Sequence, residues 1–383
     1  MPGDEEKGAN FAPRRFPHAM LREIYEQPLA IRETIERNVE REIIFPGSFR
    51  EIEGALAACK RVIIAASGSS RHAGLAGEIM MEDLAGVLVD VEYASEYCCR
   101  STHAATNPMV LVITQSGETA DTIAALREAQ KRGAATIAIS NVPDSTIARE
   151  ASAKLITYAS PERAIPATKS FTAQLTTLYL LSLFLARQRR QIPSDAISTL
   201  LGLLREIPAK IEKCLPAWDG QARDSARLFR HAKTCLFLGR GVHYAIAREG
   251  ALKLKEISYI QAEGMPAGEI LHGPNALLDE KLPVVVIATH DSRDPDSVLR
   301  YQKTLSILKY VKSRQARGIV VALEGDREVL SLSDQVIQIP RVSELLLPIL
   351  EIIPLQLFAY HFGVLNGSNV DHPRNLVKAV VTE

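Results

Sequence analysis

The sequence predicts an α/β fold made of two tandem half-domains, each with a parallel sheet between two layers of helices. Two observations predict it. Short apolar runs alternate with longer helical patterns, which is typical of parallel sheets. The same order of strand, turn and helix returns in the second half, with similar spacing from Gly68 to Gln115 and from Gly239 to His290. Two copies of one α/β unit would account for 383 residues.

The composition excludes several classes of protein. Hydrophobic residues make up 46% of the chain and the formal net charge is zero, as in ordinary soluble proteins. The chain has no excess of basic residues, so its composition does not indicate nucleic-acid binding. Five cysteines, without metal-ligand spacing, indicate reduced thiols in a cytoplasmic protein and no metal site.

The longest apolar run, Leu345–Leu365, is too interrupted for a membrane span. Pro348, Glu351 and Pro354 fall within it, whereas a span needs about 20 mostly uninterrupted apolar residues. We therefore expect a buried helix that could take part in a subunit contact.

The first half-domain is expected to cover residues 23–200, after an N-terminal tail of residues 1–22. Its opening segment, from about Ala19 to Cys59, has apolar residues at helical spacing, so we expect helices there. Beyond it we expect strands at residues 61–66, 109–114, 135–140 and 154–158, and helices at residues 72–84, 120–132 and 171–186.

The second half-domain is expected to cover residues 201–365, followed by a C-terminal tail of residues 366–383. The boundary falls near a helical connector, Leu201–Asp219, which we expect to end in a loop containing Pro216. We expect strands at residues 234–239, 282–289 and 318–324, and helices at residues 244–259 and 298–313.

Three polar turns follow predicted strands of the first half-domain. They are Gly68-Ser69-Ser70, Thr114-Gln115-Ser116-Gly117-Glu118-Thr119 and Ala167-Thr168-Lys169-Ser170. Small hydroxyl residues and glycine at a helix start suit an anion, because free backbone N–H groups and hydroxyl donors converge there. Ordinary helix N-capping uses the same residues and is the alternative for any single turn. Three such turns at one sheet edge favour a phosphate site.

The corresponding loop of the second half-domain is acidic. It contains Asp291, Asp294 and Asp296, which would repel a phosphate. We therefore assign the phosphate to the first half-domain. No P-loop is present, and Tyr244 occupies the third glycine position of a dinucleotide fingerprint, so we predict no cofactor.

The helix expected at residues 244–259 carries the densest set of candidate catalytic groups. Glu249, Lys253 and Glu256 are spaced so that all three share one helix face. A carboxylate beside a lysine suits proton transfer at a carbon next to a carbonyl. The alternative is a solvated face with salt bridges along the helix. Apolar neighbours such as Leu252 and Ile257 indicate that the face is not simply exposed.

Two further residues are candidates for acid–base chemistry. His272 precedes a Gly-Pro turn, where its pKa range would suit proton transfer during opening of a sugar ring. An ordinary loop histidine is an equal alternative. Lys378, close to the C-terminus, would by itself be taken as a solvated lysine.

The candidate motifs occur in a specific order along nearly the whole chain. They are GSS, TQSGETADT, ATKSFTAQL, REGALKLKEISYI, AGEILHGP and VDHPRNLVKAVVTE. This series resembles the sugar-isomerase (SIS) double domain of glucosamine-6-phosphate synthase, the glutamine–fructose-6-phosphate aminotransferase family. The resemblance covers about Pro17 to Glu383 and implies two tandem SIS-type half-domains.

The resemblance implies a role for each matching residue. Glu256 would move a proton between C1 and C2 of a hexose 6-phosphate, and Lys253 would support it. Lys378 would form a Schiff base with the open-chain ketose. His272 would open the ring from a neighbouring subunit, which implies a homodimer. The implied phosphate and substrate contacts are Ser69, Ser70, Thr114, Gln115, Ser116, Thr119, Ala167 and Glu249.

Some positions depart from the family pattern. Ala167 and Gln261 stand where serine and histidine are usual, and the N-terminal cysteine of the family's glutaminase part is not found. We therefore expect no glutamine hydrolysis by this polypeptide and a possible separate glutaminase subunit. The expected activity interconverts fructose 6-phosphate plus ammonia with glucosamine 6-phosphate. A glucosamine-6-phosphate deaminase, a non-catalytic sugar-phosphate sensor and the isomerase part of a longer synthase remain alternatives.

Overall fold

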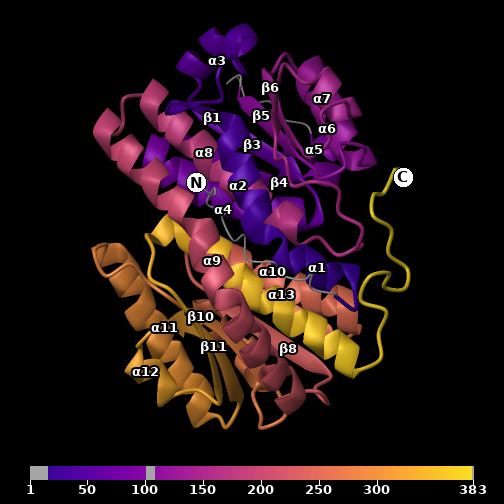
Figure 1. The fold of residues 1–383 in the computed structure, drawn as a ribbon, viewed down its shortest axis with the longest axis vertical. Coiled ribbons are helices and arrows are strands. Elements are labelled where there is room, and N and C mark those ends of the chain that lie inside the picture. The colour runs from indigo at the N-terminus through magenta and orange to yellow at the C-terminus, as the bar shows by residue number, and fades with distance from the viewer. Residues whose placement is uncertain (1–15, 101–107, 382–383) are drawn as a thin grey trace, which may run out of the picture.

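Two five-stranded parallel sheets, one in each half of the chain, organise the fold (Figure 1). The computed structural model describes residues 16–100 and 108–381. We call the parts built on the two sheets the first lobe and the second lobe. The predicted α/β fold of two half-domains with parallel sheets is confirmed.

The sheet of the first lobe has the strand order β4-β3-β5-β6-β7. Its strands are β3 (Arg61–Ala66), β4 (Leu88–Tyr93), β5 (Met109–Ile113), β6 (Thr136–Ser140) and β7 (Ala153–Ile156). The central strands are buried on both faces, because helices cover both sides of a parallel sheet. The helices of this lobe are α4 (Gly68–Ala85), α5 (Ala94–Cys99), α6 (Ala120–Lys131), α7 (Thr146–Glu150) and α8 (Lys169–Gln188).

The sheet of the second lobe, β12-β11-β10-β8-β9, repeats the same topology. Its strands are β8 (Thr234–Gly239), β9 (Gln261–Pro266), β10 (Pro283–Ala288), β11 (Arg317–Leu323) and β12 (Gln335–Ile339). Its helices are α10 (Val242–Ser258), α11 (Pro295–Ser313), α12 (Arg327–Leu330) and α13 (Leu347–Leu365), with short 3-10 turns at Ala267–Leu271, Pro274–Leu277 and Glu344–Leu346. In both sheets the connections switch direction beside the first strand, where doubly wound folds bind ligands.

The N-terminal segment is less regular than the sequence indicated. Helices α1 (Ala19–Tyr25) and α2 (Gln27–Asn38) are followed by a two-stranded hairpin of β1 (Val39–Glu40) and β2 (Ile43–Ile44). A 3-10 turn at Arg50–Ile52 and α3 (Glu53–Ala58) complete it. The expectation of helices throughout this segment was therefore wrong at the hairpin. Positive φ angles at Arg41 and Glu42 turn the chain between the two strands.

The connector between the lobes is one long helix, α9 (Ser194–Leu228). The expectation of a loop at Pro216 was wrong, because Pro208 and Pro216 both lie inside this helix. A proline inside a helix costs about 3 kcal/mol. The buried apolar face of α9, which packs against α2 and α13, offsets that cost.

The helical segment Glu344–Leu365 is long and apolar enough to cross a membrane by length and composition alone. However, 89% of its apolar window is buried inside the fold. It packs against α9 and α10. The prediction of a buried helix is confirmed.

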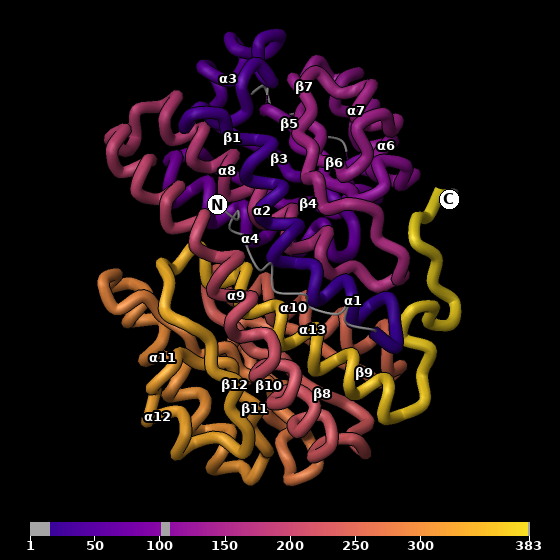
Figure 2. The backbone as a smooth tube through the Cα atoms, viewed as in Figure 1, coloured from indigo at the N-terminus to yellow at the C-terminus, as the bar shows by residue number. Residues whose placement is uncertain are grey.

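The central helices bring the two lobes together. Helix α10 of the second lobe packs against α4 of the first lobe and against α13. The C-terminal tail leaves α13, passes α1 and rises beside the first lobe, as the yellow trace in Figure 2 shows. Both segments reach the carboxyl edge of the first sheet, which positions the candidate site.

Candidate functional site

A buried cluster of charged side chains lies on one face of α10, where this helix meets the first lobe. Nζ of Lys253 lies 3.4 Å from Oε1 of Glu249 and 2.6 Å from Oε2 of Glu256. Glu249 and Lys253 are fully buried, and the Glu256 side chain is 20% exposed. The prediction that this face is not simply exposed to solvent is confirmed for the first two residues.

Helix α4 of the first lobe completes the cluster. Oγ of Ser69 donates to Oε1 of Glu249 at 2.7 Å, and Nδ1 of His72 lies 2.8 Å from Oε2. Ser69 was predicted from its strand-end turn. His72 was not singled out, although it follows Ser69 by three residues and so shares its helix face. Glu249 therefore joins the two lobes by direct side-chain contacts.

Opposite charges keep Glu249 and Lys253 ionised despite their burial. Burial alone would raise the pKa of Glu249, but the charge of Lys253 and the contact with His72 lower it below its ordinary value. Burial alone would lower the pKa of Lys253, but Glu256 and Glu249 raise it. Oε2 of Glu256 accepts no aligned hydrogen bond from the described residues. This oxygen is buried and lies 2.6 Å from the cation of Lys253, so its electrostatic partner is that ammonium group.

The second predicted turn forms a tight loop between β5 and α6. The hydroxyl groups of Thr114 and Thr119 lie 2.9 Å apart, and Oγ of Ser116 accepts from the backbone N–H of Glu118. Gly117 has φ +73°, and a Cβ there would lie 2.0 Å from a serine hydroxyl. Only glycine fits this position, which gives the loop one conformation.

The other predicted substrate residues lie around the same edge of the sheet. Oγ of Ser70 accepts from the side chain of Gln174 on α8 at 3.0 Å. Gln115 lines a cavity of about 820 Å³ together with Glu162 and Lys169. Ala167 is half-buried in the segment that precedes α8. The three polar turns thus lie around one sheet edge. Among their residues, and within the described part of the chain, Ser69 is the one whose side chain bonds to the charged cluster of α10.

The C-terminal tail places Lys378 against the segment between β7 and α8. Nζ of Lys378 donates to Oε2 of Glu162 and to the carbonyl of Ala164, both at 2.6 Å. Burial would raise the pKa of Glu162, but the charge of Lys378 lowers it. Glu162 also contributes to the raised pKa of Lys253, so the tail lysine and the α10 cluster share one electrostatic environment.

Further contacts dock the tail on both sides of Lys378. The carbonyl of Val380 accepts from the backbone N–H of Ala120, at the first residue of α6. The carboxylate of Asp371 accepts from the backbone N–H groups of Ala19 and Met20 at 2.9 and 2.8 Å. Sequence patterns did not indicate Asp371, because its partners are backbone groups more than 300 residues away.

Helix α1 supports the same segment from the other side. Glu23 is fully buried and accepts from the backbone N–H groups of Arg163 and Ala164. Burial and the nearby charge of Glu162 raise the pKa of Glu23 to about 7. No sequence signal separated Glu23 and Glu162 from ordinary surface carboxylates.

His272 makes no side-chain contact with the charged cluster within the described residues, although it shares a cavity with His72. It is exposed at the end of a 3-10 turn, and it lines a cavity of about 510 Å³ that also includes Gly68 and His72. The described part of the chain provides no hydrogen bond to its imidazole. A single chain therefore leaves this histidine free to face a neighbour.

In the second lobe, the protein's own side chains occupy the start of α10. His243, at the start of α10, contacts Glu351 at 2.7 Å and Glu344 at 3.2 Å. Burial would lower the pKa of His243, but these two carboxylates raise it to about 10. Arg300 also contacts Glu344, at 2.9 Å.

The acidic loop of the second lobe is largely neutralised. Asp291 pairs with Arg293 at 2.8 Å and Asp294 pairs with Arg300 at 3.3 Å. The expectation that the three aspartates repel an anion therefore needs correction for two of them. Within residues 16–100 and 108–381, no group of three or more His, Cys, Asp or Glu side chains is arranged to hold a metal ion.

The fold and site define a class of two-lobed α/β protein, with polar strand-end loops in one lobe and a helix of buried charged side chains from the other. The chain belongs to the SIS domain family, whose model matches residues 55–183 and 228–365. This confirms the family resemblance inferred from the motifs.

The similar proteins carry related names. The glutamine–fructose-6-phosphate aminotransferase (isomerizing) of Chlorobaculum tepidum is 45% identical over 370 residues, which is 96% of this chain and 59% of that protein. That of Aquifex aeolicus is 44% identical over 368 residues, 96% of this chain and 58% of that protein. The chain thus spans less than two thirds of the length of these curated relatives.

A solved structure matches over nearly its whole length. The C-terminal domain of glucosamine-fructose-6-phosphate aminotransferase from Francisella tularensis has a TM-score of 0.87 and 35% sequence identity. The match covers 94% of this chain and 98% of that one.

Proposed function

We propose that this chain is a phosphosugar isomerase that interconverts fructose 6-phosphate plus ammonia with glucosamine 6-phosphate. The observation that carries the proposal is the buried set of Glu249, Lys253 and Glu256, which faces Ser69 across the lobe interface. Relatives named for this reaction support the substrate class.

In this mechanism the phosphate is held at the carboxyl edge of the first sheet. The loop from Thr114 to Thr119 supplies hydroxyl donors and the backbone N–H groups that begin α6. Such a helix start favours a dianion, because the helix dipole and backbone N–H groups other than that of Ala120, which donates to the carbonyl of Val380, point toward it. The substrate would then extend toward α10 and the tail.

The chemistry needs an amine at C2 and a base at C1. The amine of Lys378 would attack the C2 carbonyl of the open-chain ketose and release water, and ammonia would then replace the lysine. Glu256 would remove a proton from C1 and return it to C2, so that C1 becomes the aldehyde carbon and the amino group stays on C2. The iminium acidifies the C1 proton, and the ammonium group of Lys253, 2.6 Å from Glu256, would stabilise negative charge that develops beside it.

A turnover assay tests the proposal directly. The protein is incubated with fructose 6-phosphate and ammonium, and glucosamine 6-phosphate is measured by mass spectrometry. The reverse incubation, with glucosamine 6-phosphate, measures ammonia release and tests the deaminase direction. A sugar-phosphate sensor would bind both sugars and convert neither, which would contradict the proposal.

Two substitutions test the assigned groups. Glu256→Gln should stop exchange of the transferred hydrogen with deuterated solvent, and Lys378→Ala should abolish turnover while sugar-phosphate binding remains. Lys255→Ala is the matched control, since Lys255 is exposed on another face of α10. Turnover that survives Lys378→Ala would remove the tail lysine from the mechanism.

The proposed partners follow from the site. We propose a homodimer, because His272 lies on an exposed segment that also presents Leu271 and Leu277, 44% and 55% exposed. A neighbouring subunit would cover these apolar side chains and bring His272 to its site. Ammonia would come from solution or from a glutaminase, and the ammonium dependence of turnover distinguishes the two sources.

A further inference from the structure

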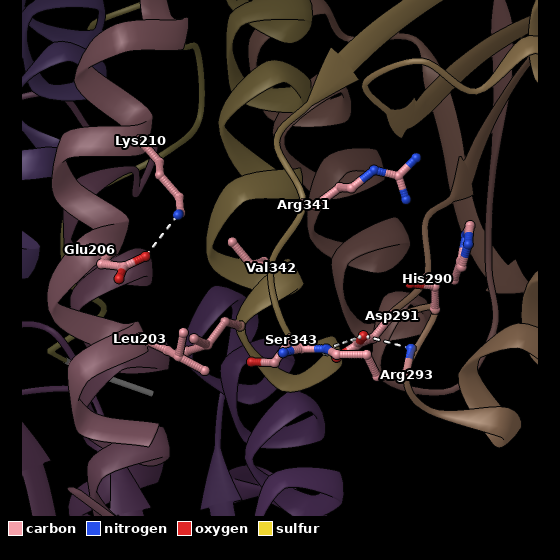
Figure 3. A pocket seen from close by; sticks show the side chains of 11 residues that line it. Leu203, Glu206, Lys210, His290, Asp291, Arg293, Arg341, Val342 and Ser343 are labelled. Carbon is pink, nitrogen blue, oxygen red and sulfur yellow. Dashed lines mark hydrogen bonds and ion pairs between the residues drawn. The ribbon is translucent and has the colours of Figure 1, made fainter. Parts of the chain in front are cut away.

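A second cavity lies in the second lobe, away from the charged face of α10. Its volume is about 270 Å³, and it lies where the loops after β10 and β12 face helix α9 (Figure 3). It is therefore at the carboxyl edge of the second sheet, which is where open α/β sheets bind ligands. The proposed reaction uses none of its lining residues.

The charge balance of this cavity is positive. Its two acidic residues already have partners: Glu206 pairs with Lys210, and Asp291 pairs with Arg293, each at 2.8 Å. Arg341 has no carboxylate partner among the residues described, and its guanidinium donates only to a backbone carbonyl, at 3.3 Å. One cation therefore remains available to a ligand.

Two polar atoms in the lining lack any hydrogen-bond partner within the described chain. Oγ of Ser343 and Nδ1 of His290 are buried and unpaired. Figure 3 shows that His290 and Arg341 come from different loops and lie across the same space. Burial, together with the charge of Arg341, lowers the pKa of His290, so its ring is neutral and can donate one hydrogen bond. Leaving buried polar groups without hydrogen bonds costs free energy. A ligand with hydrogen-bond acceptors would therefore suit Ser343 and His290.

We infer that this cavity is a binding site for a small oxyanion, a phosphate or carboxylate group, held by Arg341, Ser343 and His290. All three residues line the cavity, and a cation beside neutral hydrogen-bonding groups is the chemistry that such an anion requires. The site is separate from the sugar-phosphate loops of the first lobe. Ser343 directly precedes Glu344, which contacts His243 at the start of α10, so the ligand would bind beside the contact that holds the catalytic helix.

The histidine signals in an NMR titration provide a local test. Inorganic phosphate and, in a separate arm, malonate are added to the protein while imidazole C–H resonances are recorded, and the His290→Gln variant assigns the relevant signal. The His290 signal should shift and saturate. Because the reporter is in the second lobe, phosphate bound at the first lobe does not confuse the result.

Variants of the lining decide the assignment. Arg341→Gln should weaken the response of His290 by about tenfold or more, since it removes a charged donor. Ser343→Ala should weaken it by a smaller factor. Arg230→Gln is the matched control, since Arg230 is an exposed arginine in the segment between α9 and β8, before the second sheet begins. A His290 signal that fails to respond to either anion, or an Arg341→Gln variant that responds like the native chain, would show a water-filled cavity and overturn the inference.

Discussion

The carboxylate of Asp371 should decide whether the C-terminal tail, and with it Lys378, stays docked. Asp371 accepts two backbone hydrogen bonds from the start of α1, and its own carbonyl accepts from Ile165 at 2.9 Å. The change Asp371→Ala removes both side-chain bonds and leaves the carbonyl in place. The substitution therefore tests the anchor of the tail without touching any proposed reacting group.

The size of the expected effect follows from the two hydrogen bonds that the Asp371 side chain accepts. Hydrogen bonds to a charged group contribute about 1.5–3 kcal/mol each, and Asp371 is partly exposed, so we take about 2 kcal/mol for the pair. At about 1.4 kcal/mol for each factor of ten, undocking of the tail should become about 30 times more frequent. Global stability should change less, because the tail adds little to the buried core.

Hydrogen exchange of the tail measures this opening. The backbone N–H of Arg374 donates to the hydroxyl of Tyr259, and that of Ile165 donates to Asp371, so both report docking. Both should exchange about 30-fold faster in Asp371→Ala. Asp195→Ala, an exposed aspartate in the first turn of α9, is the control. Unchanged exchange at both reporters would refute the idea that Asp371 anchors the tail.

Three further predictions concern the loops and the buried charges. Gly117→Ala should weaken sugar-phosphate binding by at least about tenfold, measured by calorimetry, because the added Cβ clashes and requires φ +73°. Lys253→Met should lower the free energy of unfolding by about 3–5 kcal/mol in urea titrations, because it leaves a buried carboxylate without its cation. Third, below about pH 6.5 the free energy of unfolding of the native chain should exceed that of His243→Gln by its full margin. This difference should disappear as the pH rises toward 10, because the pKa of His243 is raised in the folded state.

Each of these has its own control. Gly133→Ala has φ +79° but no atom within 4 Å of the new Cβ, so it separates backbone strain from the clash. Lys255→Met removes an exposed lysine and should cost little. For the histidine, a constant difference between the two proteins from pH 6 to pH 10 would contradict the assigned coupling.

The sequence predicted the central strands well and the edge strands poorly. The runs at Arg61–Ala66 and Met109–Ile113 are apolar throughout because both faces of the sheet are covered. The missed strands β4, β9 and β12 all lie at sheet edges. β4 contains Asp90 and Glu92, and β9 contains glycine and proline. Edge strands keep polar residues because one side faces solvent, so they lack the apolar signal.

The residues of the site also include some that sequence patterns predicted and some that they did not. Helical spacing was enough to place Glu249, Lys253 and Glu256 on one face. Their burial was not predictable from that spacing, because it depends on α4 from the other lobe, which contributes Ser69 and His72. Local patterns contain no information about contacts between residues far apart in the chain. The same limit applies to Asp371 and Glu23, whose carboxylates accept hydrogen bonds from backbone N–H groups far away in the chain.

The two lobes repeat one topology, yet the start of the helix that follows the first strand is built differently in each. In the first lobe, Ser70 at the start of α4 bonds to Gln174 on α8. At the matching place in the second lobe, His243 at the start of α10 bonds to Glu351 on α13. Glu344 adds a second carboxylate whose pKa is lowered to about 2, chiefly by contact with His243 and Ser297 against the effect of burial. Glu344 therefore places a negative charge beside the start of α10, which makes this helix start a poor place for a phosphate.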